Sequence, residues 1–189
     1  MSTARRVPSA DADQRHGDGP HGGREVGWSR RRAVFVLGIV VGVAALDQLT
    51  KTWAVHALDD GPMSIIGDDV ELRLSHNTGS AFSLFQGFTP LLAVLAVVLA
   101  IVLVRAVRRT DDTVMLVALS LVLGGAVGNL IDRVARSPGF LEGAVVDFIS
   151  IDDFPTFNVA DSAITIGAVL LVVRTIFGMR DERGDEVTT

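Results

Sequence analysis

The 189-residue chain contains no cysteine. This absence excludes a disulfide framework, a thiolate metal site and a cysteine nucleophile. Histidine is also scarce. Only His56 and His76 lie outside the N-terminal tail (1–32), and there is no HExxH motif. Two histidines are too few for a three-histidine zinc site. We therefore expect neither a metal ion nor a cofactor.

Lysine occurs once, at Lys51, and this limits serine chemistry. Ser80 and Ser162 lie near carboxylates in the sequence, but neither stands in a GxSxG motif, which presents a serine nucleophile on a strained turn. A Ser–Lys pair would have to use Lys51, which lies four residues after Asp47 and is better placed to pair with that carboxylate. Serine catalysis is therefore disfavoured.

What the chain has instead is apolar sequence: 49% of its residues are hydrophobic and the mean hydropathy is +0.42, although 21% are charged. The apolar residues form four stretches, at about 33–49, 88–104, 113–131 and 159–177. Each is long enough to cross a hydrocarbon layer ~30 Å thick. A soluble helical core is the alternative, but soluble helices rarely contain runs such as LLAVLAVVLAIVLV. We expect a membrane all-α fold, a bundle of four transmembrane helices.

The positions of lysine and arginine predict the orientation. Thirteen of the 17 lie in the N-terminal tail, in the short loop between the second and third spans, or after residue 173, and four lie in the other two loops. The positive-inside rule then places both termini in the cytoplasm. We expect a disordered cytoplasmic tail (1–32), a membrane domain (33–179) and a cytoplasmic C-terminal tail (180–189).

Polar side chains gather at the outer ends of three predicted spans. Residues three or four apart share a helix face, and each of these ends carries such a set. The sets are Asp47 and Lys51 ending the first span, Asn129, Asp132 and Arg133 ending the third, and Asn158 and Asp161 opening the fourth. We expect them to lie at one level of one leaflet. Small residues in the third span, Gly124, Gly125, Ala126 and Gly128, are typical of close helix packing.

The outer loops carry two strand patterns. Residues 70–75 alternate apolar and polar side chains and lead into a turn-like segment with Asn77 and Gly79. The segment GAVVDFISI is rich in β-branched residues and carries Asp147. We expect a small β-rich platform on the extracytoplasmic surface, holding Asn77 and Asp147 above the helix ends.

Paired carboxylates are the chemistry that remains. Two aspartates held close cannot both ionise, so one can activate water while the other donates a proton. Spacing alone allows several pairs. Two of the aspartates have a neighbouring cation, which favours structural ion pairs of Asp47 with Lys51 and of Asp132 with Arg133. Asp147 and Asp161 then remain as the best pair, with the choice still open.

A small proton-coupled transporter or channel would also need carboxylates within the membrane. Such a protein predicts polar residues through the membrane thickness or broken helices at the midplane. The four spans here are apolar in the middle and polar at one end, which favours an enzyme. A purely structural scaffold would leave several costly carboxylates without a role.

Five motifs, in order across the four spans, closely resemble those of lipoprotein signal peptidases (signal peptidase II). They are DQLTK, NTGSAF, GGAVGNLIDR, VVDF and FNVADSAI. The resemblance covers about residues 33–177. It implies an aspartic endopeptidase of the bacterial plasma membrane that removes the signal peptide of prolipoproteins by cleaving before a diacylglyceryl-modified cysteine.

The resemblance also implies roles for individual residues. Asp147 and Asp161 match the catalytic pair, while Asn129, Asp132, Arg133 and Asn158 match residues that line and orient the site. Four further positions match residues that support the pocket: Asp47, Lys51, Asn77 and Gly79. The implied partners are the prolipoprotein substrate and membrane lipids, with no nucleic acid, and the enzyme is expected to act as a monomer with its active site at the extracytoplasmic face.

Overall fold

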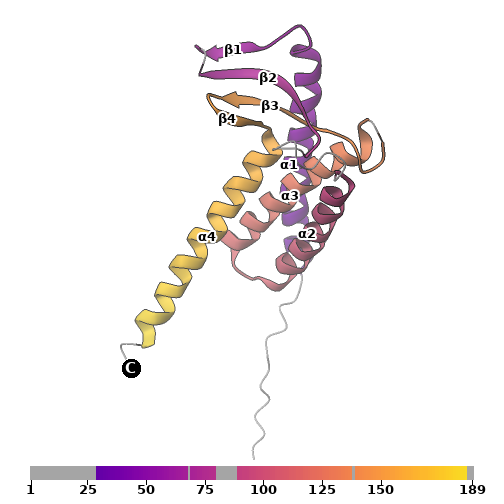
Figure 1. The fold of residues 1–189 in the computed structure, drawn as a ribbon. Helices are drawn as coiled ribbons and strands as arrows, with labels where there is room; N and C mark the ends of the chain where they lie inside the picture. Colours follow the sequence, from indigo (N-terminus) through magenta and orange to yellow (C-terminus); the bar gives the residue numbers. More distant parts are fainter. Residues whose placement is uncertain (1–28, 68, 80–88, 138, 187–189) are drawn as a thin grey trace, which may run out of the picture.

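The computed structural model describes residues 29–67, 69–79, 89–137 and 139–186. A small antiparallel sheet lies at one end of a bundle of helices (Figure 1). The helices are α1 (Arg30–Ala57), α2 (Thr89–Arg109), α3 (Thr113–Ala135) and α4 (Val159–Glu186), and the strands are β1 (Met63–Ile66), β2 (Val70–Asn77), β3 (Val145–Ile151) and β4 (Phe154–Phe157). This arrangement confirms the predicted four-helix fold with a β-rich platform.

Each of the four helices is long and apolar enough to cross a membrane, over Arg30–Ala57, Pro90–Arg109, Thr113–Ala135 and Val159–Gly178. Two predicted boundaries shift. The predicted N-terminal tail falls mostly on residues 1–28, outside the described residues, but α1 already begins at Arg30, with Ser29 accepting a hydrogen bond from the N–H of Arg32. At the other end, α4 continues to Glu186, past the predicted start of a C-terminal tail at residue 180.

The first helix is also longer than predicted. It continues past Lys51, which we expected to lie at its end. Hydropathy indicates where a helix leaves the membrane. The helix itself ends only where turn-forming residues interrupt its backbone conformation. Here α1 runs two further turns to Ala57, before the Asp59–Pro62 segment, which is rich in turn residues. The extension has its own function in the fold, because Ala54 and Leu58 pack against Phe148 of the sheet.

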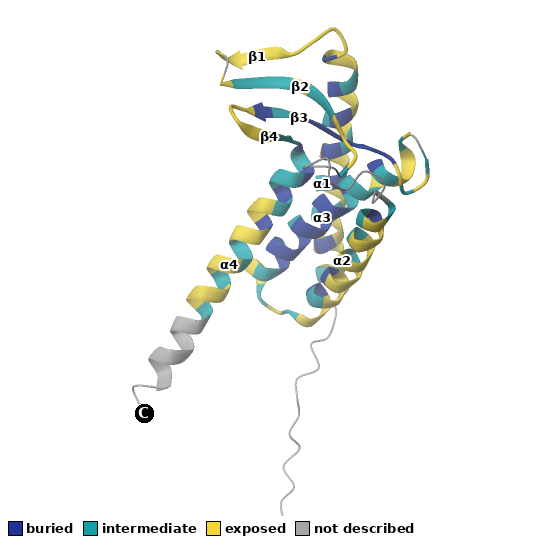
Figure 2. Cartoon of the chain, viewed as in Figure 1, coloured by how far each residue is buried: buried dark blue, intermediate teal, exposed yellow. Residues whose placement is uncertain are grey.

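α3 is the central helix of the bundle. It packs against α1, α2 and α4, and 56% of its most apolar window is buried, against 17% in each of the other three helices. Figure 2 shows this difference as a buried α3 between helices with exposed outer faces. The exposed side chains on α1, α2 and α4 are mainly Val, Leu, Ile and Phe, as lipid-facing surfaces require.

Small residues bring α3 and α4 close together, as predicted. A Cβ at Gly125 of α3 would collide with the carbonyl of Ala160 in α4, and a Cβ at Gly167 of α4 would collide with the carbonyl of Ala118 in α3. The two helices therefore touch through their backbones at both sites. This contact fixes the start of α4, which carries Asp161.

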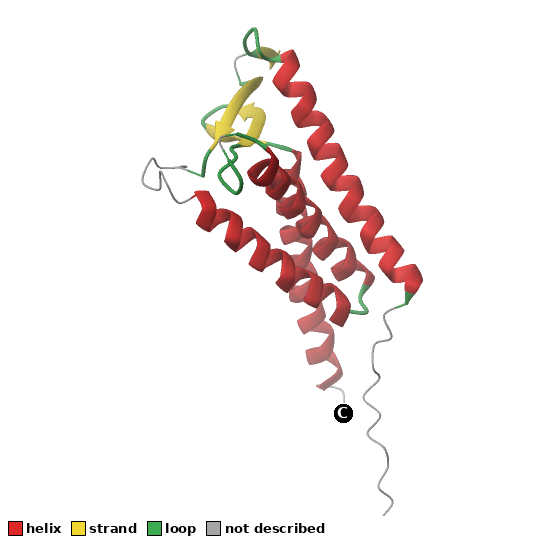
Figure 3. Cartoon of the chain, turned by 90° about the vertical axis from the view of Figure 1, so that its right-hand side faces the viewer, coloured by secondary structure: helices red, strands yellow, loops and turns green. Residues whose placement is uncertain are grey.

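The sheet has the order β1-β2-β3-β4, and all neighbours are antiparallel. It sits over the ends of the bundle helices, beside the last turns of α1 (Figure 3). The predicted strands became β2 and β3, whose register places Ser75 opposite Asp147 and Asn77 opposite Val145. The edge strands β1 and β4 were not predicted, and β4 contains Pro155, which only an edge strand tolerates well.

Substituting Gly125 by alanine should destabilise the protein, because the added methyl group would overlap the Ala160 carbonyl. Overpacking of this kind costs about 1–3 kcal/mol. Gly38 is the matched control: it lies in α1, and nothing stands within 4 Å of an added Cβ. Gly38→Ala should be neutral or slightly stabilising, since alanine is favoured over glycine in helices. Thermal unfolding in detergent measures both, and equal melting temperatures for the two variants would contradict close α3–α4 packing.

Candidate active site

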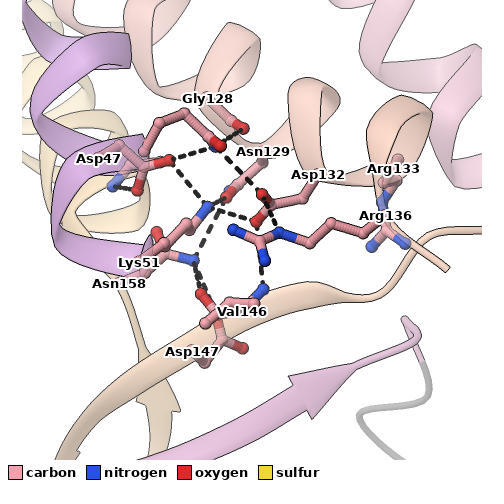
Figure 4. A network of polar contacts seen from close by, with 12 residues as sticks. Asp47, Lys51, Gly128, Asn129, Asp132, Arg133, Arg136, Val146, Asp147 and Asn158 are labelled. Carbon is pink, nitrogen blue, oxygen red and sulfur yellow. Dashed lines mark hydrogen bonds and ion pairs between the residues drawn. The ribbon is translucent and has the colours of Figure 1, made fainter. Parts of the chain in front are cut away.

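The single lysine lies at the centre of a buried polar cluster at the sheet end of the bundle (Figure 4). Lys51 Nζ is 2.8 Å from a carboxylate oxygen of Asp47, 2.8 Å from one of Asp132 and 2.8 Å from the amide oxygen of Asn129. An ammonium has three N–H donors, so these three contacts use all of them. The side chains of Lys51, Asp47 and Asp132 are fully buried. We call these four residues the Lys51 cluster.

The cluster is balanced in charge by one further cation. Arg136, the C-cap residue that follows α3, donates from its Nε to Asp132 at 2.7 Å. The predicted pairing of Asp132 with Arg133 is therefore wrong, because adjacent residues on a helix point in different directions whereas residues four apart share a face. The Arg133 guanidinium lies instead 3.5 Å from the carbonyl of Gly143. The predicted pairing of Asp47 with Lys51 is confirmed.

The two carboxylates of the cluster also fix backbone groups of other elements. Asp47 accepts a hydrogen bond from the Ala160 N–H at 2.9 Å, in the first turn of α4. Asp132 accepts one from the Val146 N–H at 3.1 Å, in β3. Gly128 of α3 leaves room for this arrangement, since a Cβ there would contact the Asp47 carboxylate. The cluster thus ties α1 and α3 to the two segments that carry Asp161 and Asp147.

Asn158 connects the two candidate catalytic carboxylates. Its side-chain amide donates to Asp147 at 2.6 Å, and its backbone N–H donates to Asp161 at 3.3 Å. Its amide oxygen in turn accepts from the Asp161 N–H at 2.9 Å and so caps the start of α4. Asn158 is fully buried, and one residue therefore fixes the position of both carboxylates.

Two more amides complete the surroundings of these carboxylates. Asn129 donates to Asp161 at 2.8 Å while its oxygen accepts from Lys51. Asn77, at the end of β2, donates to Asp147 at 3.1 Å. The oxygen of Asn77 accepts from the Gly79 N–H at 2.8 Å, and Gly79 adopts a positive φ of 91° that favours glycine. Among the described residues, the side chains that hydrogen-bond to Asp147 and Asp161 are thus neutral amides, while the charges of Lys51 and Arg133 act on Asp147 through space.

Asp147 is the more deeply buried of the two, with 2% of its surface exposed. Burial raises its pKa to about 6, with a further upward contribution from the negative charge of Asp161, against the hydrogen bonds from Asn77 and Asn158. Asp161 is only half-buried. The two carboxylates therefore differ in solvent access, and among the residues that the structure describes neither forms an ion pair.

A groove of about 490 Å³ leads to Asp161 from the outside of α4. Its lining is largely apolar and comes from β4 and from the first two turns of α4, including Phe154, Phe157 and Ile166. The described residues contain no group of three His, Asp or Glu side chains placed to hold a metal ion. The arrangement offers two carboxylates held by amides, one of which, Asp161, lies at an apolar groove.

All ten site residues named from the sequence lie in this region, at the sheet end of the bundle. Sequence reasoning gave no role to Gln48 or Arg136. Gln48 donates to the Gly128 carbonyl at 3.0 Å and to Asp132 at 3.1 Å. Two features of the sequence could have identified them. Gln48 lies within the DQLTK motif, and Arg136 follows Asp132 by four residues. The roles of the Val146 and Ala160 backbone N–H groups could not be predicted from the sequence, because every residue except proline has such a group.

Residues 39–177 match the family model described as Signal peptidase (SPase) II. The chain is 46% identical over 176 residues to a lipoprotein signal peptidase of Rhodococcus jostii, a match covering 91% of this chain and 88% of the relative. It is 45% identical over 149 residues to one of Mycobacterium avium, covering 78% and 82%. A solved bacterial membrane enzyme is similar in fold, with a TM-score of 0.68 and 30% identity over 78% of this chain and 90% of that one.

The match extends from within α1 to within α4, so it includes every residue of the Lys51 cluster together with Asp147, Asn158 and Asp161. The fold, the four membrane-spanning helices and the sequence all agree with these relatives. This chain belongs to the signal peptidase II family.

Proposed function

We propose that Asp147 and Asp161 form the catalytic dyad of a membrane aspartic endopeptidase that cleaves prolipoproteins before their diacylglyceryl-modified cysteine. The family removes signal peptides from prolipoproteins. The observation that carries the dyad is the double contact of Asn158, at 2.6 Å to one carboxylate and 3.3 Å to the other. A residue that hydrogen-bonds to both carboxylates at once keeps the two within reach of one substrate bond.

The difference in burial favours distinct roles for the two carboxylates. Asp161, half-buried beside the groove, takes a proton from a water molecule, and the water oxygen bonds to the scissile carbonyl carbon. Asp147, with its raised pKa, gives its proton to the carbonyl oxygen. Asp161 then protonates the amide nitrogen, the C–N bond breaks, and the hydroxyl proton of the intermediate returns to Asp147. The dyad ends in its starting state.

The remaining site residues act by position. Asn129 and Asn158 orient Asp161, and Asn77 and Asn158 orient Asp147. The charged members of the Lys51 cluster, together with Arg136, hold the backbone and the amides around the dyad in place. Arg133 and Gly79 lie at the edge of the site, where we propose that they support the pocket.

We propose that the sheet end faces outward and that both termini are cytoplasmic, since the opposite end carries the excess of arginine. Residues 33–179 then form the peptidase domain, with the dyad near the outer membrane surface. The apolar groove beside Asp161 lets a lipid-anchored peptide reach the dyad without leaving the bilayer. One chain supplies both carboxylates, so we propose that the enzyme acts as a monomer.

Replacing either dyad residue should abolish cleavage without unfolding the protein. Asp147→Asn and Asp161→Asn each remove one proton-transfer group, worth about 10²–10⁴-fold in rate. Asp153→Asn is the matched control, because Asp153 is exposed in the turn between β3 and β4. A gel-shift assay with purified diacylglyceryl-modified prolipoprotein measures the three variants. Cleavage by a folded Asp161→Asn variant at the wild-type rate would remove that residue from the dyad.

The dyad mechanism also predicts how activity depends on pH. Asp147 must be protonated to donate, and its pKa is raised to about 6. The cleavage rate constant kcat/KM should therefore fall about tenfold per pH unit above about pH 6. A rate that stays level from about pH 6 to about pH 8 would show that Asp147 is not the acid in the free enzyme.

The protonation of Asp147 should also make the stability of the folded protein depend on pH. The raised pKa means that the folded protein keeps the Asp147 proton between its ordinary value of 3.8 and about 6, whereas the unfolded chain releases it. The contribution to stability is complete below that window and is lost as pH rises through about 6. The uncharged Asp147→Asn variant should therefore gain in melting temperature relative to wild type over this window.

Replacing Lys51 should damage the site through its structure. Lys51→Met leaves the buried carboxylates of Asp47 and Asp132 with one cation between them, and breaking a buried pair in this way costs about 3–5 kcal/mol. The double variant Asp47→Asn/Lys51→Met keeps Asp132 paired with Arg136 and should recover part of that loss. Thermal unfolding measures both variants, and a single variant as stable as wild type would contradict the central role of Lys51.

A further inference from the structure

A second groove lies between α1 and α2 over α3, and it shares no lining residue with the groove beside Asp161. It has a volume of about 550 Å³ and is lined by Val97, Ile101 and Val104 of α2, Leu123 and Val127 of α3, and Val40 of α1. A smaller groove of about 300 Å³ shares Val40, Val104 and Leu123 with it and continues toward the first turns of α1. The side chains on α2 are 38–47% exposed, so the groove opens to the outside of the bundle.

Two arginines stand at one end of this groove. Arg105 and Arg108 belong to its lining, and Arg108 lines the smaller groove as well. Both side chains are exposed, and among the described residues neither forms an ion pair. They lie in the last turns of α2, at the end of the bundle opposite the sheet (Figure 1).

The acidic residues nearby are already paired with other cations. Asp111 accepts from Arg32 of α1 at 2.6 Å, and Asp112 accepts from Arg174 of α4 at 2.8 Å. Both aspartates belong to the short connection that follows α2. The two arginines at the groove thus lack a counter-charge in the described protein, and an anion is what they would bind.

Along α2, the lining of the groove covers the depth of about one half of a bilayer. From Arg108 to Val97 is 11 residues of helix, which at 1.5 Å per residue is about 16 Å. One leaflet of a hydrocarbon core ~30 Å thick is about 15 Å deep. An acyl chain lying along α2 would fill the groove while its phosphate lies at the level of the arginines.

We propose that the groove between α1 and α2 binds an anionic phospholipid, with an acyl chain against α2 and α3 and the phosphate on Arg105 and Arg108. The occupant is the lipid of the leaflet on the side away from the dyad, so this site is distinct from the substrate groove beside Asp161. The proposal does not depend on the assignment of the dyad.

The test uses the full-length protein in detergent, with native mass spectrometry to count retained lipid. The probe is phosphatidylglycerol, compared with phosphatidylcholine of the same acyl chains. Wild type should retain phosphatidylglycerol in preference. Arg105→Gln/Arg108→Gln should weaken that retention about tenfold, because it removes two charge-assisted contacts to the phosphate. Arg109→Gln is the matched control, since Arg109 is exposed in the same turn but does not line either groove.

Two further arms separate the source of the anion and the role of the groove. Inorganic phosphate should not raise the melting temperature, whereas phosphatidylglycerol should. Ala100→Phe places a large side chain in the groove and should displace the lipid. Four outcomes would each overturn the proposal. They are equal retention of the two lipids by wild type, an equal loss of retention in the Arg109 variant, stabilisation by inorganic phosphate alone, and full retention in the Ala100 variant. Unchanged prolipoprotein cleavage by the arginine variants shows that they are folded.

Discussion

The site depends on one buried ammonium group. Lys51 is the only lysine in the chain, and its three N–H donors meet two carboxylates and one amide oxygen, each at 2.8 Å. Burying a charge is costly unless it is paired and fully hydrogen-bonded, and both conditions are met here. The same pairing allows Asp47 and Asp132 to be buried. None of the three charged members of this cluster, Asp47, Lys51 and Asp132, can be removed alone without leaving an uncompensated charge behind.

This requirement is what links the helices to the sheet. Once Asp47 and Asp132 are held by Lys51, their free lone pairs accept the Ala160 and Val146 N–H groups. The Ala160 N–H belongs to the first turn of α4, where a helix leaves its donors without internal partners. The Val146 N–H belongs to the strand residue just before Asp147. The backbone next to each residue of the proposed dyad is therefore held by the cluster, in addition to the hydrogen bonds that the two carboxylates accept themselves.

The sequence predicts most of what depends on local periodicity. Hydropathy located the four spans, alternation located β2, β-branched residues located β3, and four-residue spacing paired Asp47 with Lys51. It did not locate the end of α1, because the packing of Ala54 against the sheet extends a helix beyond the membrane. The sequence also favoured an ion pair between Asp132 and the adjacent Arg133. In the structure the Arg133 side chain points away from Asp132, toward the Gly143 carbonyl.

Contacts between distant segments were the harder part of the site. The register of β2 on β3 puts Asn77 within reach of Asp147, and no local pattern in either strand specifies that register. Likewise, Asn158 was expected to orient Asp161 from its spacing of three, but its 2.6 Å contact to Asp147 follows only once β3 lies beside the start of α4. Spacing alone therefore left the partner of Asp161 open, and only the resemblance pointed to Asp147.

The choice of amides around the dyad follows from the proton that the proposed mechanism needs. A lysine or arginine bound directly to Asp147 or Asp161 would favour ionisation of both, and the proton for the substrate carbonyl would be lost. In this structure the charge of Lys51 is matched by Asp47 and Asp132, and Asn129 passes on only a neutral hydrogen bond to Asp161. The amides fix geometry while leaving the carboxylates to interact with each other. Burial then outweighs the through-space attraction of the Lys51 charge and holds a proton on Asp147 up to a pH of about 6.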